Sequence, residues 1–125
     1  MISGTITPTA LGTYSVPLPG TPTGAHLFAS GKGNTQENDQ ARISTGIISS
    51  NTQHADAMLV NANGYFCRNY RSSDDKCIVV LGTPAGVLKR VLAIKHVSFT
   101  TNAWNFQVVD IDPDYQIPVS VSFEF

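Results

Sequence analysis

The sequence carries little charge. Lysine, arginine, aspartate and glutamate make up 14% of its 125 residues, whereas about 25% is typical of soluble domains, and the formal net charge is −1. The eight lysine and arginine residues are scattered, so no basic stripe can follow the phosphates of a nucleic acid. We therefore expect no nucleic-acid partner, and a surface made polar mainly by Ser, Thr, Asn and Gln.

Long apolar runs and a secretory leader are also missing. The longest mostly apolar segment, residues 87–97, is interrupted by Lys89, Arg90 and Lys95, and it is shorter than the roughly 20 residues that cross a bilayer. Residues 1–8 lack the cationic start and apolar centre of a secretory signal. These features predict a protein that is made in the cytoplasm without a signal peptide and has no membrane partner.

Cysteine is scarce. Cys67 and Cys77 are too few to define a disulfide scaffold. They lie symmetrically about Ser72 in a polar stretch, so a hairpin centred there would place them opposite each other at bridging distance. The spacing allows a bridge, whereas a reducing cytosol favours two buried thiols.

Turn-forming residues, by contrast, recur at short and fairly even intervals. They leave segments of strand length, which are residues 13–18, 25–30, 42–48, 55–61, 65–70, 77–81, 87–99, 104–110 and 117–125. We expect the segment 87–99 to be bent or broken because of its length. Short strands at this spacing are typical of a β-sandwich or barrel.

Apolar and polar residues alternate with a period of two near the C terminus, as expected of strands with one buried face. Val119, Val121 and Phe123 alternate with serines, and Trp104 and Phe106 alternate with Asn105 and Gln107. Residues 77–81 are apolar throughout, which favours a central strand covered on both faces by another layer or by a neighbouring subunit. We predict a single all-β domain over residues 1–125, a jelly-roll-like, two-sheet antiparallel β-sandwich of about eight or nine strands, with residues 1–12 as an extended arm.

Residues that could carry chemistry do not form a recognisable set. Asp110, Asp112 and Asp114 have the alternate spacing of calcium ligands, but Pro113 interrupts them and no glycine permits the sharp turn that such a loop needs. The three histidines, His26, His54 and His96, have no second ligand at metal-binding spacing, and the glycines around Lys32 lack the rest of a phosphate loop. The sequence therefore predicts no catalytic, cofactor-binding or metal-binding residue, no cofactor, and a protein that is not an enzyme.

Low surface charge favours contact with other proteins, because the centres of interfaces are depleted in charge. We expect such contacts in the N-terminal arm and in the polar loop 31–40, through Ile2, Ile6, Tyr14, Lys32, Asn34 and Glu37. The alternative is a glycan platform on the hairpin at residues 65–71, where aromatic faces and bidentate donors suit a sugar. Its contact residues would be Tyr65, Arg68, Tyr70 and Arg71.

From residue 16 to residue 125 the order of segments resembles that of small bacteriophage virion proteins and related phage β-sandwich modules. The resemblance lies in residues 22–31, 41–47, 71–81, 97–99 and 104–125, while Thr101-Asn102-Ala103 departs from it by replacing an Asp-Gly turn. It implies a structural protein on the outer surface of a virion, a capsid decoration (cement) or tail-associated subunit. Its partners would be the major capsid protein or another virion protein and further copies of itself, in a homo-oligomer such as a trimer. The alternative that it implies is a receptor-binding or lectin-like module of a phage tail.

Overall fold

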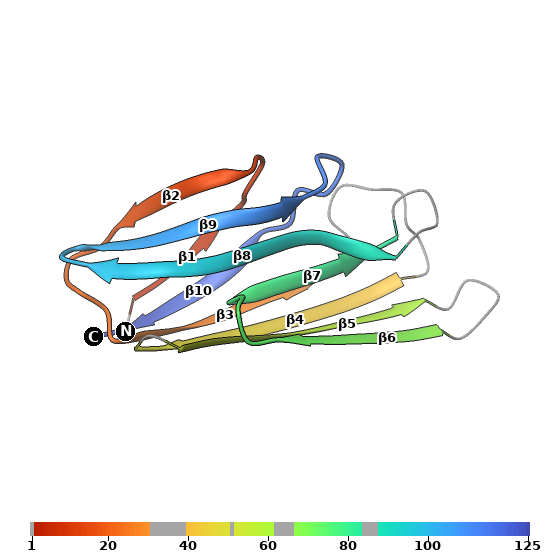
Figure 1. Cartoon of the computed structure of the whole chain (residues 1–125), viewed down its shortest axis with the longest axis horizontal. Coiled ribbons are helices and arrows are strands. Elements are labelled where there is room, and N and C mark those ends of the chain that lie inside the picture. Colours follow the sequence, from red (N-terminus) through yellow and green to blue (C-terminus); the bar gives the residue numbers. More distant parts are fainter. Residues whose placement is uncertain (1, 31–39, 51, 62–66, 84–87) are drawn as a thin grey trace.

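The computed structural model describes residues 2–30, 40–50, 52–61, 67–83 and 88–125. These residues form strands and connections without any helix, so no described helix could cross a membrane. Two antiparallel sheets lie one over the other (Figure 1). The predicted all-β sandwich is thus confirmed, with ten strands instead of eight or nine.

Each predicted strand is present, although several begin or end a few residues away from the expected positions. The six-stranded sheet has the order β1 (Ile2–Ile6), β10 (Val119–Glu124), β3 (Gly24–Ser30), β4 (Gln40–Ser49), β5 (Thr52–Asn61) and β6 (Cys67–Ser73). The four-stranded sheet has the order β2 (Gly12–Pro17), β9 (Ala103–Ile111), β8 (Lys89–Thr100) and β7 (Ile78–Gly82). The strands β3 to β6 follow one another in the first sheet and β7 to β9 in the second, so most connections stay within a sheet.

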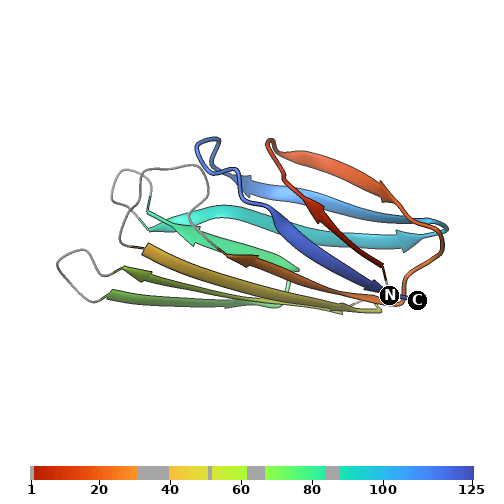
Figure 2. The ribbon, with the colours of Figure 1, turned by 180° about the vertical axis from the view of Figure 1, so that it is seen from behind.

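The N-terminal segment is part of the sandwich. Residues 2–6, expected as part of an arm, form β1 and pair along their whole length with β10, from Ile2 opposite Phe123 to Ile6 opposite Val119. Figure 2 shows β1 beside β10 at the edge of the six-stranded sheet. The arm is therefore corrected to an edge strand, which is ordered by a partner more than a hundred residues away in the same chain.

The core lies between the sheets, and the alternating segments supply its aromatic part as predicted. Trp104, Phe106, Val121 and Phe123 are buried, while the serines and Gln107 between them face outward or stay half-exposed. Trp104 stacks on Phe106 with ring centroids 4.4 Å apart and meets Phe123 edge-on at 5.5 Å. These rings join β9 of one sheet to β10 of the other.

Strand β7 is buried on both faces, as its continuous apolar run predicted, although it is an edge strand of the four-stranded sheet and not a central one. Ile78 and Val80 join the main core, while Val79 and Leu81 belong to a second cluster with Ala55, Ala57 and Leu59 of β5. Residues of the six-stranded sheet therefore help to bury the side chains on both faces of β7.

Strand β8 continues beyond the end of β7, and its register against β9 shifts twice, consistent with the predicted bend. Where β8 has no β7 residue beside it, the side chain of Gln53 bonds to its backbone instead. The Gln53 Oε1 accepts a hydrogen bond from the His96 N–H at 2.8 Å, and its Nε2 donates to the His96 carbonyl at 3.2 Å. These bonds satisfy the backbone of β8 and join β5 to the opposite sheet.

The chain does not form the hairpin around Ser72 that would have allowed a bridge between Cys67 and Cys77. Cys67 begins β6 of the six-stranded sheet, opposite Asn61, whereas Cys77 immediately precedes β7 of the other sheet. Residues 74–77 therefore connect the two layers instead of turning back within one. Cys77 is a free, buried thiol that donates to the Ile94 carbonyl at 3.4 Å, and burial raises its pKa to about 12.

Candidate functional site

The outer face of the six-stranded sheet, which points away from the other sheet, carries large apolar side chains. They are Phe28 on β3, Ile43 and Ile47 on β4, Met58 on β5 and Tyr70 on β6, and each is exposed. We call this set the apolar patch. A contiguous patch of this kind on a soluble protein marks a contact site more often than scattered apolar residues do.

The patch is continuous across the strands. Ile43 lies opposite Met58, and Met58 lies opposite Tyr70, so these side chains form one cross-strand row. Phe28 lies opposite Thr45 in the next row, and Ile47 lies opposite His54 in the row beyond. Because opposite residues in a sheet share a face with their Cβ atoms about 5 Å apart, the patch forms one surface.

Strand β4 is inverted relative to the usual pattern of apolar residues inside and polar residues outside. Arg42 and Ser44 point into the sandwich and are 2% and 1% exposed, while Ile43 and Ile47 are 47% and 43% exposed. The buried Arg42 guanidinium lies over the Tyr115 ring, 5.2 Å from its centroid. A strand that exposes two of its three isoleucines, while Ile48 and an arginine are buried, breaks a rule of folding, and such exceptions concentrate at functional sites.

A hydrogen-bonded cluster, His54, Asp56, Tyr70, Ser72 and Asp74, borders the patch on β5 and β6 and beyond the end of β6. The Tyr70 hydroxyl donates to Asp56 Oδ1 at 2.5 Å. His54 Nε2 lies 3.1 Å from the same Asp56 oxygen, and His54 Nδ1 lies 2.6 Å from Asp74 Oδ1. The bonds fix the orientation of the Tyr70 ring, although 59% of this residue is exposed.

Ser72, His54 and Asp74 have the pairwise contacts of a nucleophile, a base and an orienting acid, since Ser72 Oγ lies 3.2 Å from His54 Nε2. Two features oppose that chemistry. Asp56 shares the same imidazole nitrogen, which favours a protonated ring that cannot accept the Ser72 proton. The Asp74 side chain is also 93% exposed, so the set lies in water, where fixed dipoles stabilise a transition state poorly. The cluster is better suited to holding Tyr70 than to nucleophilic catalysis.

The electrostatics of the cluster agree with this assignment. Hydrogen bonds to Asp74 and then to Asp56 raise the pKa of His54 above its ordinary value of 6.5. The Tyr70 hydroxyl, followed by His54, lowers the pKa of Asp56, and the same bond to Asp56 raises the pKa of Tyr70. The two carboxylates thus favour the protonated, imidazolium form of His54.

Replacing His54 by glutamine is expected to change how stability depends on pH. Because the folded pKa of His54 is raised, its contribution is fully present below the unfolded value of 6.5 and is lost as pH rises through the folded value. The difference in melting temperature between wild type and His54→Gln should therefore be largest near about pH 6 and decline as the pH rises above the ordinary histidine pKa. His26→Gln, another exposed histidine, is the control, and a difference that grows as pH rises would contradict the assignment.

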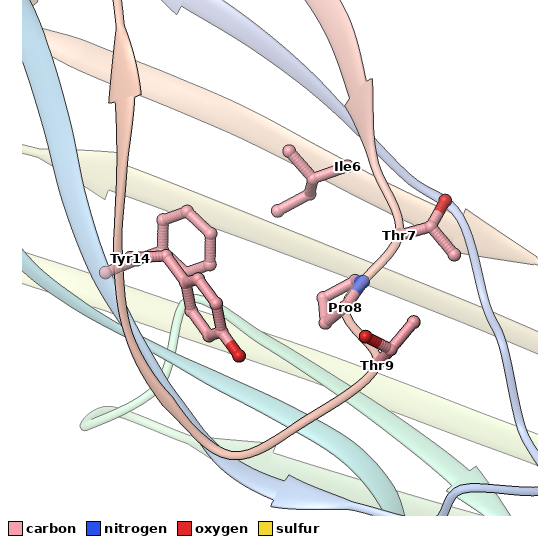
Figure 3. A pocket seen from close by; sticks show the side chains of 6 residues that line it. Ile6, Thr7, Pro8, Thr9 and Tyr14 are labelled. Carbon is pink, nitrogen blue, oxygen red and sulfur yellow. The ribbon is translucent and has the colours of Figure 1, made fainter.

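A second candidate surface lies at the side of the sandwich where β1 and β2 are the edge strands of the two sheets. A cavity of about 150 Å³ is lined by Ile6, residues 7–9, Tyr14 and Phe106 (Figure 3). Figure 3 shows Ile6 and Tyr14 pointing toward it from β1 and β2. Tyr14 stacks on Phe106 at 5.7 Å, and its hydroxyl donates to the Ala10 carbonyl at 2.9 Å. The structure thus brings together Ile6 and Tyr14, two of the contact residues predicted from the sequence, with Ile2 at the other end of β1.

These surfaces are defined by geometry alone. No protein-family model, curated protein or solved structure matches the chain. Of the other predicted contact residues, Lys32, Asn34, Glu37 and Tyr65 lie outside the described residues, as does the side chain of Arg68.

The predicted glycan hairpin is divided between two faces. Tyr70 lies opposite Met58 on the outer face, whereas Arg71 lies opposite the buried Ala57 and so belongs to the other face of β6. They cannot form one flat platform together. The sequence did not lead us to expect His54 and Asp56 as neighbours of Tyr70. The available signal was their spacing of two residues, which places both side chains on the same face of one strand.

The acidic run begins with Asp110 in β9 and continues past the end of that strand into a turn at residues 113–114. Asp112 Oδ1 accepts the Asp114 N–H at 3.0 Å, and Asp112 Oδ2 lies 3.1 Å from Lys89 Nζ. The Asp114 amide, and after it Lys89, lower the pKa of Asp112. Within the part of the chain that the structure describes, no group of three metal-ligating side chains gathers at this turn or elsewhere.

Proposed function

We propose that this chain is a non-catalytic structural protein that binds an assembled protein shell through the apolar patch, as a capsid decoration or cement subunit on the outer surface of a virus particle. The observation that carries the contact function is the exposed row Ile43, Met58 and Tyr70, flanked by Phe28 and Ile47 on the open face of a sheet. Support for the virion setting comes from the order of sequence segments, which resembles that of phage virion proteins.

The proposed mechanism is thermodynamic. A subunit that binds only the assembled shell stabilises that shell by linkage, since binding shifts the equilibrium away from the dissociated capsid protein. Individual contacts can be weak, because many copies on one lattice act together. An exposed apolar surface fits this task, because apolar side chains lose little free energy of hydration when they are covered.

The double variant Ile43→Lys/Met58→Lys is expected to reduce binding to assembled capsids by about a hundredfold, because it places two charges in the centre of a desolvated contact. Both residues are exposed, so the free energy of unfolding should change by only about 0.5 kcal/mol. Co-sedimentation with capsids assembled without this protein, over a range of concentrations, gives the affinity.

The matched control is Val97→Lys, which adds a lysine at an exposed apolar residue of β8 in the other sheet. Equal loss of capsid binding in the control and the double variant would remove the apolar patch from the proposal. Failure of the wild-type chain to sediment with capsids would remove the decoration function itself.

The second candidate function is glycan binding, and one observation favours it. Next to the exposed Tyr70 ring lies a shallow hollow of about 180 Å³, lined also by Asp56, Thr45 and Met58. An aromatic face beside a carboxylate suits a pyranose ring with its hydroxyl groups. On a glycan array, Tyr70→Phe should retain a signal that Tyr70→Ala loses, and absence of any signal for the wild-type chain leaves shell binding as the function.

A further inference from the structure

The free edge of β1 lacks the features that usually protect an edge strand. Such strands tend to carry charges, proline or a bulge, which discourage pairing with another chain. β1 has none of these, since its sequence is Ile-Ser-Gly-Thr-Ile and it pairs with β10 in unbroken register. Its residues are exposed except for Ile6, and among the described residues no backbone hydrogen bond is made to its other side. The opposite edge of the same sheet, β6, carries the exposed Arg71.

The sequence of β1 has nearly the same pattern in both directions. In an antiparallel pair of two β1 strands with Gly4 opposite Gly4, each Ile2 lies opposite the partner's Ile6, and each Ser3 opposite the partner's Thr5. The isoleucines share the inner face, because Ile2 and Ile6 lie opposite the buried Phe123 and Val119 of β10. We propose that two copies of the chain pair through β1 in this register, about a two-fold axis at Gly4, and join their six-stranded sheets into one.

The cavity beside β1 supports this register. Ile6 lines it together with Tyr14 (Figure 3) and with Phe106. Ile2 is 38% exposed. In the paired strands, the partner's Ile2 lies next to Ile6 on the same face, with Cβ atoms about 5 Å apart. It therefore covers the mouth of the cavity with apolar surface. The space at the axis is also open, because a Cβ atom added to Gly4 would meet nothing within 4 Å.

This pairing rests on the proposed function as an assembly protein and supplies one of its partners, a second copy. Self-complementary contacts of this kind are the rule in two-fold dimers. A strand of five residues buries less than the roughly 1,200 Å² of a stable interface, so we expect a dimer that dissociates in the micromolar range. On a lattice, such weak contacts act together with binding to the shell.

Charge reversal tests the register. Ser3→Lys/Thr5→Lys places two lysines opposite each other on both sides of the axis, whereas Ser3→Lys/Thr5→Glu places each lysine opposite a glutamate. In sedimentation velocity at up to about 1 mM protein, we expect wild type and the Lys/Glu variant to dimerise and the Lys/Lys variant to dimerise at least tenfold more weakly. Ser15→Lys/Thr13→Lys on β2 is the control with the same added charge, and it should dimerise like wild type.

Cross-linking tests the axis. Cα atoms of opposite residues lie about 4.5–5.5 Å apart, within the roughly 4.4–6.8 Å that a disulfide spans. In a Cys67→Ser background, Gly4→Cys should form a disulfide-linked dimer under mild oxidation, while Ser15→Cys on β2 should not. A wild-type chain that stays monomeric at about 1 mM, a trimer unaffected by the Lys/Lys substitution, or equal cross-linking of the two cysteine variants would each overturn the pairing.

The outcomes separate this inference from the function. Capsid binding that persists in the Lys/Lys variant, together with its loss of dimerisation, supports the pairing and leaves the apolar patch as the shell contact. Dimerisation in a chain that never binds capsids would support the pairing while contradicting decoration.

Discussion

Substitution of Gly46 by alanine should lower the free energy of unfolding by about 3 kcal/mol and the melting temperature by roughly 10 °C. Gly46 lies on the inner face of β4, where the start of β7 approaches it. A Cβ atom there would lie 1.6 Å from the Cys77 carbonyl oxygen and 2.7 Å from its carbon. Backbone cannot yield as a flexible side chain does, and β7 is also held by the Cys77 N–H, which donates to the Ile94 carbonyl at 2.8 Å. Either β7 moves away from the six-stranded sheet or β4 bends outward.

Gly4→Ala is the matched control, since its Cβ atom would meet nothing within 4 Å. Urea denaturation of the three proteins at low concentration, followed by circular dichroism, measures the effect. The control should stay within about 0.5 kcal/mol of wild type, or gain slightly because alanine restricts the unfolded chain. A melting temperature of Gly46→Ala within about 2 °C of wild type would show that β7 does not pack against β4 at this point.

The strands could be predicted from the sequence because turn residues separate them and because one face of most of them is buried. Val119–Glu124 and Ala103–Ile111 alternate as a half-buried strand must, and the structure buries the expected residues. β1 was not recognised, since its order comes from pairing with β10 at the far end of the sequence. Long-range pairing of this kind leaves no local signal beyond the alternation of five residues.

The apolar patch could not be predicted for a different reason. Periodicity tells which residues share a face of a strand, but hydrophobicity is then used to decide which face is buried. On β4 that choice gives the wrong answer, because Arg42 and Ser44 are inside and Ile43 is outside. On β3, Leu27 and Phe28 are both apolar, so nothing local distinguishes the buried residue from the exposed one. Only the assembled sandwich shows which face is free.

The connection between β6 and β7 shows a third limit. The symmetric spacing of Cys67 and Cys77 about Ser72 fits a hairpin, and the polar residues between them fit a turn. The same features fit a crossing between layers, which is what the chain forms here, with Asp75 accepting a hydrogen bond from the Ser73 hydroxyl at 2.6 Å. Whether the chain turns back or crosses depends on which sheet can accommodate β7. Because Gly46 has no side chain, the residues that begin β7 can lie close against β4 of the six-stranded sheet.

The largest loss of stability is expected for Trp104→Ala, about 4 kcal/mol, because it removes a fully buried indole that contacts both sheets. The ring stacks on Phe106 of β9 and meets Phe123 of β10 edge-on, and its Nε1–H donates to His96 Nδ1 at 3.0 Å. Thermal and urea unfolding by circular dichroism measure the loss, since the variant has no tryptophan left for fluorescence.

Trp104→Phe separates packing from the hydrogen bond. Phenylalanine keeps an aromatic ring but leaves the buried His96 Nδ1 without its donor, so we expect a smaller loss of about 2 kcal/mol. Because Phe123 lies opposite Ile2, a loosened Trp104 site should also free β10 and β1, and Trp104→Ala should weaken dimerisation under conditions in which the chain still folds. Equal losses of stability for the two variants would mean that the hydrogen bond to His96, and not the aromatic contact between the sheets, holds this end of the sandwich together.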